Sequence, residues 1–229
     1  MQVNRTEQKI YITIQEAMLL KRKLDAILPR DKNSQSEKGY EIRTLYFDTV
    51  DDRCCAEKED GLRIHEKIRI RIYGINSDII KLESKMKVGD AQIKKSMAID
   101  KQTLDALIKG DYHVLLNIDN PMAQYFFTKL SDAMMPKCII QYDRLSYCLP
   151  TNNIRITFDS NIRATESSFD LFAQPLLTHP IAPPDCVILE VKYNNFLFDY
   201  IKDALRGVRK SPSSFSKYFY GRTFHRYMI

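Results

Sequence analysis

The sequence has few of the residues and motifs that usually carry catalysis or hold zinc. Its 4 His residues are dispersed, and its 5 Cys residues show no spacing typical of a zinc site. It contains no glycine-rich phosphate loop and no Gly-x-Ser-x-Gly sequence. The odd number of Cys residues, with Cys54 and Cys55 adjacent, indicates reduced thiols rather than a disulfide framework. These absences argue against a zinc enzyme, a P-loop enzyme and a hydrolase with a serine nucleophile.

Long hydrophobic runs are also missing. No stretch approaches the roughly 18 apolar residues that a membrane span needs, and the first residues lack the apolar core of a secretion signal. We therefore expect a cytoplasmic protein with no membrane span of its own. The sequence leaves open a membrane-protein partner.

The charge balance is moderately basic. The 229 residues carry a net charge of +6, with 44% hydrophobic and 28% charged residues, as in soluble globular proteins. This excess favours an anionic ligand without implying nucleic acid. No change of composition marks a linker, so a single domain over residues 1–229 is the simplest expectation.

Residues 67–73 alternate strictly between a cation or Tyr and an isoleucine. Successive side chains of a strand point to opposite faces. Lys67, Arg69 and Arg71 would therefore line one face, and the isoleucines the other. Cations that repeat on one face repel one another, which suggests that this face meets an anion.

Similar alternation recurs in other segments of the chain. They are residues 5–14, 79–87, 140–147, 154–159 and 187–193. For one strand alone, a solvated polar face is the ordinary explanation. Repeated over several strands, the cations instead indicate a basic sheet surface or a barrel with its charged face inside. Because strands outnumber helices and seldom alternate with them, we expect an α+β fold: a closed antiparallel β-barrel, or tunnel, with helices packed on its outside.

Cations that converge inside a barrel need an anionic partner, because unpaired buried charges are costly. Arg makes bidentate contacts to phosphate, and Lys acts as a mobile point charge. The interleaved carboxylates Glu7, Glu83 and Glu190 would repel phosphate unless Mg²⁺ or Mn²⁺ lay between them. The pattern suggests metal-assisted phosphoryl transfer, which needs no His or Ser nucleophile. For each Glu taken singly, pairing with a neighbouring Lys or Arg is the more ordinary role.

A set of short motifs resembles, in order, those of VTC-type polyphosphate polymerase domains in the triphosphate tunnel metalloenzyme (CYTH-like) superfamily. They are Arg5-x-Glu7-x-Lys9, Leu45-Tyr46-Phe47-Asp48-Thr49, Arg69-x-Arg71-x-Tyr73-Gly74, Leu82-Glu83-x-Lys85, Tyr142-x-Arg144, Arg155-x-Thr157-Phe158-Asp159, Leu189-Glu190-Val191-Lys192 and Phe215-Ser216-Lys217-Tyr218. Each motif is weak by itself, but their order covers nearly the whole chain.

The resemblance implies a tunnel that binds ATP, inorganic triphosphate or polyphosphate, with Mn²⁺ or Mg²⁺ as cofactor. It implies phosphate binding by Lys9, Arg69, Arg71, Lys85, Lys95, Tyr142, Arg144, Arg155, Lys192, Ser216 and Lys217, with Lys94 as the alternative to Lys95. Within this set, the catalytic cations would be Lys9, Arg69, Arg71, Lys85, Arg144 and Lys217. Glu190 would hold the metal, assisted by Glu7 or Glu83.

Several functions fit this pattern. The first is polyphosphate synthesis from ATP; hydrolysis of triphosphate or polyphosphate in the same tunnel is the alternative. A third possible function is that of a module that binds polyphosphate without turnover. A nucleic-acid-binding sheet ranks last, because only Tyr11 and Tyr73 interleave with the cations for base stacking. We therefore expect no nucleic-acid partner.

Overall fold

The computed structural model describes residues 5–34, 36–89, 91–208 and 215–223. Its elements are β1 (Arg5–Thr13), α1 (Ile14–Asp25), β2 (Tyr40–Asp48), α2 (Arg53–Glu59), β3 (Ile64–Tyr73), β4 (Ile80–Val88), β5 (Ala91–Ile99), α3 (Lys101–Ile108), η1 (Tyr112–Asn117), α4 (Pro121–Leu130), β6 (Met135–Leu149), η2 (Thr151–Asn153), β7 (Ile154–Thr165), β8 (His179–Pro180), β9 (Cys186–Asn194), α5 (Asp199–Leu205) and α6 (Lys217–Thr223). The predicted α+β class is confirmed. In these ranges, no helix combines the length and the apolar character that crossing a membrane requires.

Contacts divide the chain into two compact units, each made of segments that are distant in sequence. The first unit contains Met1–Glu41, Tyr142–Ile162 and Ala182–Phe215, and the second contains Ile42–Gln141, Arg163–Ile181 and Ser216–Ile229. Strands β2, β6 and β7 contribute residues to both units. This interleaving explains why no linker is visible in the sequence. The single-domain expectation stays a prediction.

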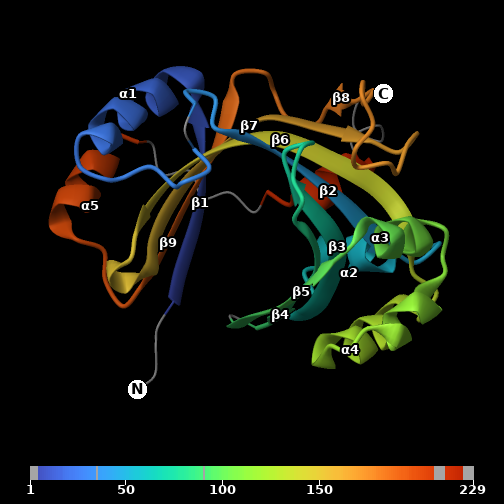
Figure 1. The fold of residues 1–229 in the computed structure, drawn as a ribbon. Coiled ribbons are helices and arrows are strands. Elements are labelled where there is room, and N and C mark those ends of the chain that lie inside the picture. The colour runs from blue at the N-terminus through green and yellow to red at the C-terminus, as the bar shows by residue number, and fades with distance from the viewer. Residues whose placement is uncertain (1–4, 35, 90, 209–214, 224–229) are drawn as a thin grey trace. The chain divides into compact units, whose positions relative to one another are not determined.

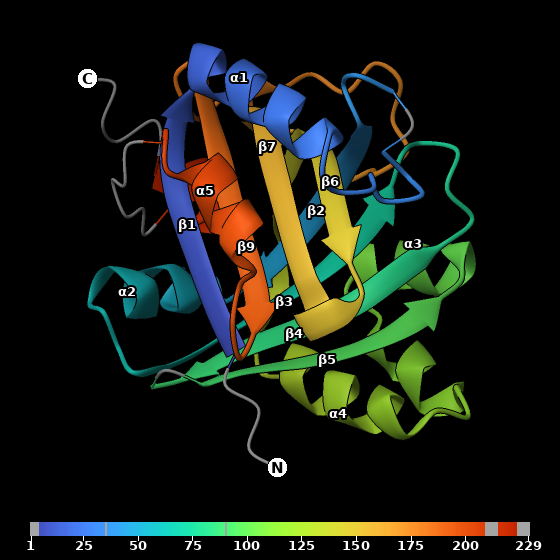
Figure 2. The same cartoon turned by 90° about the vertical axis from the view of Figure 1, so that its left-hand side faces the viewer.

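The first unit is built on neighbouring antiparallel strands, β1 beside β9 and β9 beside β7. Helices α1 and α5 lie across one face of these strands (Figure 2). α1 begins with a capping box, in which the backbone N–H of Glu16 donates to Thr13 Oγ1 at 3.1 Å and that of Thr13 to Glu16 Oε2 at 2.8 Å. Ala17, Leu20 and Leu24 recur at helical spacing and are buried in the core of this unit.

Alternation along β9 separates the core of the first unit from its charged residues. Leu189 and Val191 are part of the hydrophobic core cluster beneath α1 and α5. Glu190 and Lys192 alternate with them and so point to the other face. The sequence pattern therefore predicts correctly which side chains of β9 share a face.

The second unit contains β2, β3, β4 and β5, which are neighbours in that order and antiparallel. Helices α3 and α4 lie beside these strands (Figure 1). Ile68, Ile70 and Ile72 of β3 are each 0% exposed. The apolar half of the alternating run is thus in a core, as the sequence predicts.

The closed barrel predicted from the sequence is not formed by the described residues. In these ranges β1 pairs with β9 alone and β5 with β4 alone, so each unit ends in an edge strand. Period-two alternation shows which side chains share a face. It does not show whether the first and last strands pair, because closure depends on the tilt and stagger of the whole sheet.

Two local features are not evident from the sequence pattern. α4 ends at Leu130, and Met135 begins β6. Ala133 takes a φ of 54° between them, which is incompatible with a continued right-handed helix. The charged segment 51–61 contains the short helix α2, whose Cys54 and Cys55 are buried.

Candidate active site

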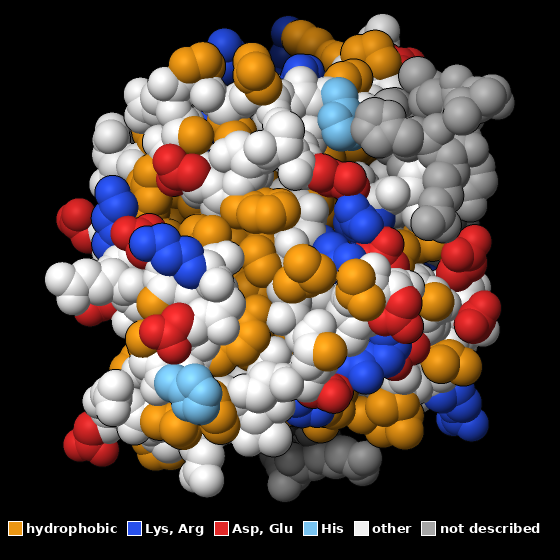
Figure 3. All heavy atoms as spheres, turned by 90° about the vertical axis from the view of Figure 1, so that its right-hand side faces the viewer, with side chains coloured by type: hydrophobic (Ala, Val, Ile, Leu, Met, Phe, Trp, Pro, Cys, Tyr) orange, Lys and Arg blue, Asp and Glu red, His pale blue; other side chains and the backbone are white. Residues whose placement is uncertain are grey.

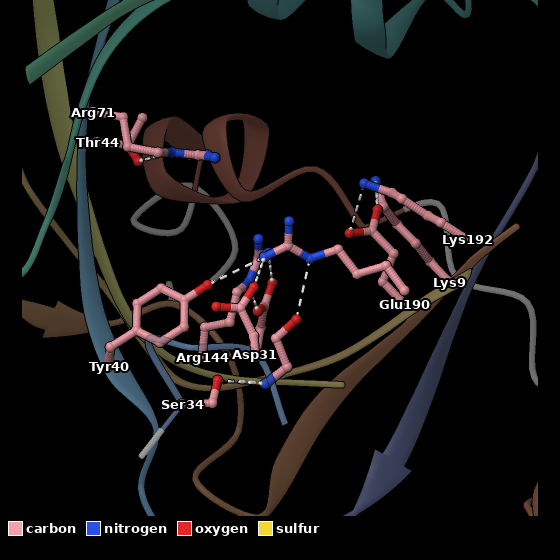
Figure 4. Close-up of polar contacts among 12 residues, drawn as sticks. Lys9, Asp31, Ser34, Tyr40, Thr44, Arg71, Arg144, Glu190 and Lys192 are labelled. Carbon is pink, nitrogen blue, oxygen red and sulfur yellow. Dashed lines mark hydrogen bonds and ion pairs between the residues drawn. The ribbon is translucent and has the colours of Figure 1, made fainter. Parts of the chain in front are cut away.

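Four charged side chains of β1 and β9 alternate in sign across the two strands. Glu7 lies opposite Lys192, and Lys9 lies opposite Glu190. Lys192 Nζ is 3.1 Å from Glu190 Oε2 and 3.8 Å from Glu7 Oε2, while Lys9 Nζ is 3.7 Å from Glu190 Oε1 and 3.4 Å from Glu7 Oε1. Lys9, Glu190 and Lys192 point toward one another (Figure 4). We call these four residues the β1–β9 ion group; it joins two predicted metal ligands to two predicted phosphate-binding lysines.

The pKa of Glu190 reflects two opposing effects. Burial favours the neutral carboxyl group, but the charges of Lys192 and Lys9 hold the pKa of Glu190 well below its ordinary value. Burial also lowers the pKa of Lys192, while Glu190 and Glu7 raise it. Glu190 is therefore a carboxylate at neutral pH, able to bind a cation.

Arg144 is oriented by Asp159. Its Nε donates to Asp159 Oδ1 and its Nη2 to Oδ2, both at 2.7 Å. The guanidinium also lies over the Tyr142 ring, 5.3 Å from the ring centroid. The pair fixes the plane of the guanidinium, so Asp159 is a positioning residue for the predicted phosphate contact of Arg144.

Arg155 is anchored in a similar way. Its Nε donates to Ser146 Oγ at 3.1 Å, and its Nη2 donates to Asp31 Oδ2 at 3.2 Å and to Tyr40 Oη at 3.4 Å. Arg155 also lies opposite Lys192 in the pairing of β7 with β9. The structure thus brings Arg155 to the β1–β9 ion group.

The donor atoms near Glu190 fit a hard divalent cation. Thr157 lies opposite Glu190, and its Oγ1 is buried without a hydrogen-bond partner among the described residues. Glu190, Glu7 and Thr157 together offer only oxygen donors, which Mg²⁺ and Mn²⁺ prefer. In the described ranges no three His, Cys, Asp or Glu side chains form a metal-binding group. An ion held here would therefore complete its coordination with oxygens of a bound phosphate or of water.

In the second unit, Glu83 is surrounded by cations of β3 and β5. Arg69 Nε donates to Glu83 Oε2 at 2.9 Å, Lys94 Nζ lies 2.5 Å from Oε1, and Arg71 Nη1 lies 3.9 Å from Oε2. Burial opposes ionisation of Glu83, but these three charges lower its pKa to about 2. Arg71 Nε also donates to Thr44 Oγ1 at 3.2 Å (Figure 4). We call Glu83, Arg69, Arg71 and Lys94 the Glu83 cluster; its geometry suits a counter-ion, and metal binding by Glu83 stays a prediction.

Lys94 and Lys95 lie on opposite faces of β5. Lys94 is directly opposite Lys85 of β4 and shares its face. Lys95 Nζ instead lies 3.4 Å from the centroid of the Tyr125 ring, on α4. The structure therefore brings Lys94 to the cations of β3 and β4, and not Lys95, which the sequence analysis preferred. The sequence could not decide, because two adjacent lysines satisfy either register.

Ser216 and Lys217 lie at the start of α6. Lys67 Nζ of β3 donates to Ser216 Oγ at 2.8 Å. Tyr218 Oη donates to Asp48 Oδ2 at 2.5 Å, and Asp48 Oδ1 accepts the backbone N–H groups of Thr49 and Cys54. Asp48 thus ties α6 to the end of β2 and keeps Ser216 beside the cations of β3.

A family model of the VTC domain matches residues 4–225 of this sequence. The chain belongs to the VTC domain family. The resemblance seen in the short motifs is confirmed by this match. No curated protein matches the chain.

Solved structures give weaker likenesses. A protein of Bacillus halodurans, described as a candidate adenylate cyclase, has a TM-score of 0.49 and 11% identity, over 90% of this chain and 89% of its own. A Vibrio parahaemolyticus protein with the same description also has a TM-score of 0.49 and 11% identity, over 93% of this chain and 94% of its own. The Mediator head module of Schizosaccharomyces pombe has a TM-score of 0.47 and 7% identity, over 89% of each chain.

Sequence reasoning missed the acidic residues that orient the basic ones in this VTC domain. Asp159 holds Arg144, Asp31 contacts Arg155, and Asp48 holds Tyr218. Asp48 and Asp159 stand within the quoted motifs, and alternation places Asp159 on the same face as Arg155. Asp31 follows a helix in a polar loop, and no local signal identifies it.

Proposed function

We propose that this VTC domain is a metal-dependent phosphotransferase that uses ATP to extend a polyphosphate chain, with Mn²⁺ or Mg²⁺ as its cofactor. The β1–β9 ion group is the observation that carries this proposal. Its ionised Glu190 lies beside Glu7, and both have lysine Nζ atoms within 3.8 Å. Lysines attract phosphate and carboxylates repel it, so both can serve one phosphate site when a cation lies between carboxylate and phosphate.

The residues have separate roles in this proposal. Glu190 and Glu7 hold the cation, which neutralises charge on the phosphate oxygens when it is bound. Lys9 and Lys192 contact the same carboxylates and attract those oxygens. Arg144, whose plane Asp159 fixes, offers a fork of N–H donors to a phosphate group. The chain thereby positions its substrates and stabilises their charge without a nucleophile of its own.

Transfer of the γ-phosphoryl group needs no reactant other than ATP and the polyphosphate chain. The bond between the γ-phosphorus of ATP and the oxygen that bridges to the β-phosphate breaks, and ADP leaves. A terminal oxygen of the polyphosphate chain forms the new bond to the same phosphorus. Hydrolysis would use water in place of that oxygen, so the same site serves the triphosphatase alternative, and the assay must separate the two.

Nucleic acid is not part of the proposal. Figure 3 shows basic and acidic side chains interspersed among hydrophobic ones on the face that it draws. A nucleic-acid site needs a continuous basic surface, and the described side chains of this face do not form one.

Incubation of the full chain with ATP and Mn²⁺ tests the proposal. A gel should show polyphosphate, and a phosphate assay should show little free phosphate. Glu190→Gln should lower turnover by about a hundredfold while polyphosphate binding persists. Glu59→Gln, which removes the same charge from an exposed position of α2, should leave turnover unchanged.

Other outcomes of this assay contradict the proposal. Free phosphate without polymer would identify a triphosphatase. Tight polyphosphate binding without turnover of ATP would leave a binding module. Equal loss of binding and turnover in Glu190→Gln would show that Glu190 has a structural role.

A further inference from the structure

Tyr46 of β2 contacts Arg69 on the face of the sheet that carries the Glu83 cluster. The two residues stand opposite each other in the pairing of β2 with β3, so their side chains share one face. Arg69 Nη1 donates to Tyr46 Oη at 3.3 Å, and the guanidinium carbon lies 6.0 Å from the centroid of the Tyr46 ring. Because Tyr46 is only 6% exposed, little water competes for this hydrogen bond.

Glu83 and Tyr46 hold the guanidinium of Arg69 at different nitrogen atoms. Glu83 Oε2 accepts from Nε at 2.9 Å and lies 2.9 Å from Nη2, whereas Tyr46 Oη accepts from Nη1. The contacts to Glu83 fix one edge of the group, and the contact at Nη1 resists rotation about that edge. Together they define the plane in which Arg69 presents its N–H groups.

The Tyr46 ring is held in turn by α6. It stacks on the ring of Tyr218, with centroids 5.0 Å apart and planes at 29° to each other. Tyr218 Oη donates to Asp48, which is fully buried and lies two residues after Tyr46 on β2. A continuous path of contacts therefore runs from Asp48 through Tyr218 and Tyr46 to Arg69.

The charges around Tyr46 suit an oxygen that accepts a hydrogen bond. Burial raises the pKa of Tyr46, but the charges of Arg69, Arg71 and Lys67 and the hydrogen bond from Arg69 lower it below its ordinary value. Surroundings that favour negative charge on the phenol oxygen also strengthen a hydrogen bond that this oxygen accepts.

We propose that Tyr46 is a positioning residue for Arg69, whose guanidinium it orients toward a bound phosphate group by accepting a hydrogen bond from Nη1. This rests on the proposed function, because Arg69 is a predicted phosphate contact. The stack with Tyr218 keeps Tyr46 in place, so α6 contributes to the orientation of Arg69 as well. Tyr46→Phe isolates the role of the hydroxyl group, because it keeps the ring and its stack.

NMR of the guanidinium groups in the ligand-free full chain tests the orientation itself. Hindered rotation should give Arg69 separate Nη1 and Nη2 signals, which are identified by their loss in Arg69→Lys. Tyr46→Phe should speed this rotation about tenfold, the change expected for one lost hydrogen bond to a charged group. Tyr147→Phe is the matched control, because it removes a buried hydroxyl group that donates to Asp25 instead. An unchanged rotation rate in Tyr46→Phe would overturn the proposal, since Glu83 alone would then fix the plane.

Calorimetric titration with inorganic triphosphate tests the consequence for binding. Tyr46→Phe should weaken binding about tenfold, and Tyr218→Phe should weaken it less, because it acts through Tyr46. In the Arg69→Lys background, Tyr46→Phe should have little further effect, because the guanidinium that it positions is gone. A full tenfold loss in that background would overturn the proposal. Neither measurement needs turnover: a chain that shows both effects but does not consume ATP contradicts the proposed function and supports the role of Tyr46.

Discussion

The β1–β9 ion group and the Glu83 cluster both surround a buried carboxylate with cations, but they hold it differently. Around Glu83 the nearest nitrogen atoms are at 2.5 and 2.9 Å, and two of the three cations are guanidinium groups. Around Glu190 the lysine nitrogens are at 3.1 and 3.7 Å. Flexible lysines at longer distances can release a carboxylate to a metal ion, whereas Glu83 accepts a hydrogen bond from Arg69 and lies in close ion pairs with Arg69 and Lys94. This difference supports the proposal that the first group, rather than the second, holds the metal ion.

The largest expected effect is on stability. Glu83→Gln removes the fully buried carboxylate shared by Arg69 and Arg71, whose side chains are 14% and 10% exposed, and should lower the free energy of unfolding by about 3–5 kcal/mol. Glu190→Gln should lower the free energy of unfolding clearly less, because the side chains of Lys9 and Lys192 are 31% and 23% exposed to water. Urea unfolding of both variants measures the difference. Equal losses would remove the distinction between the two groups.

A smaller effect should appear with pH. The pKa of Glu83 falls from 4.5 to about 2 on folding, because the charges of Arg69, Arg71 and Lys94 outweigh its burial. A lowered pKa gives stability that is complete above pH 4.5 and is lost as the pH falls toward 2. Over that window the free energy of unfolding should drop by about 3 kcal/mol from this group. Glu83→Gln should remove that part of the slope, and an unchanged slope would contradict the assignment.

The smallest effect distinguishes two adjacent lysines. Lys94→Gln should reduce polyphosphate affinity about tenfold through the loss of one charge-assisted contact. Lys95→Gln should leave it nearly unchanged, because Lys95 lies over the Tyr125 ring on the opposite face. Titration of both variants under identical salt tests the register of β5. A stronger effect of Lys95→Gln would instead support Lys95 as the phosphate-binding residue, as predicted from the sequence.

Much of the site was predictable from alternation alone. The pattern placed Lys67, Arg69 and Arg71 on one face of β3, and it did the same for Glu190 and Lys192 of β9. These assignments need only the period of a strand, which is a local property. The partners of these residues were not predictable, because Asp31 and Asp48 lie far along the chain from the groups that they contact. Which of Lys94 and Lys95 shares a face with Lys85 also depends on the pairing register of β4 and β5.

The sequence by itself determined the α+β class, the charged faces of the strands and membership of the VTC family. These follow from composition, from period-two alternation and from the order of short motifs. Only the tertiary structure decided that Glu7 and Glu190 share two lysines while Glu83 is held by arginines, and that the described strands end in open edges. Those outcomes depend on which strands become neighbours and in what register. Strand pairing joins residues far apart in the chain, and no local pattern encodes it.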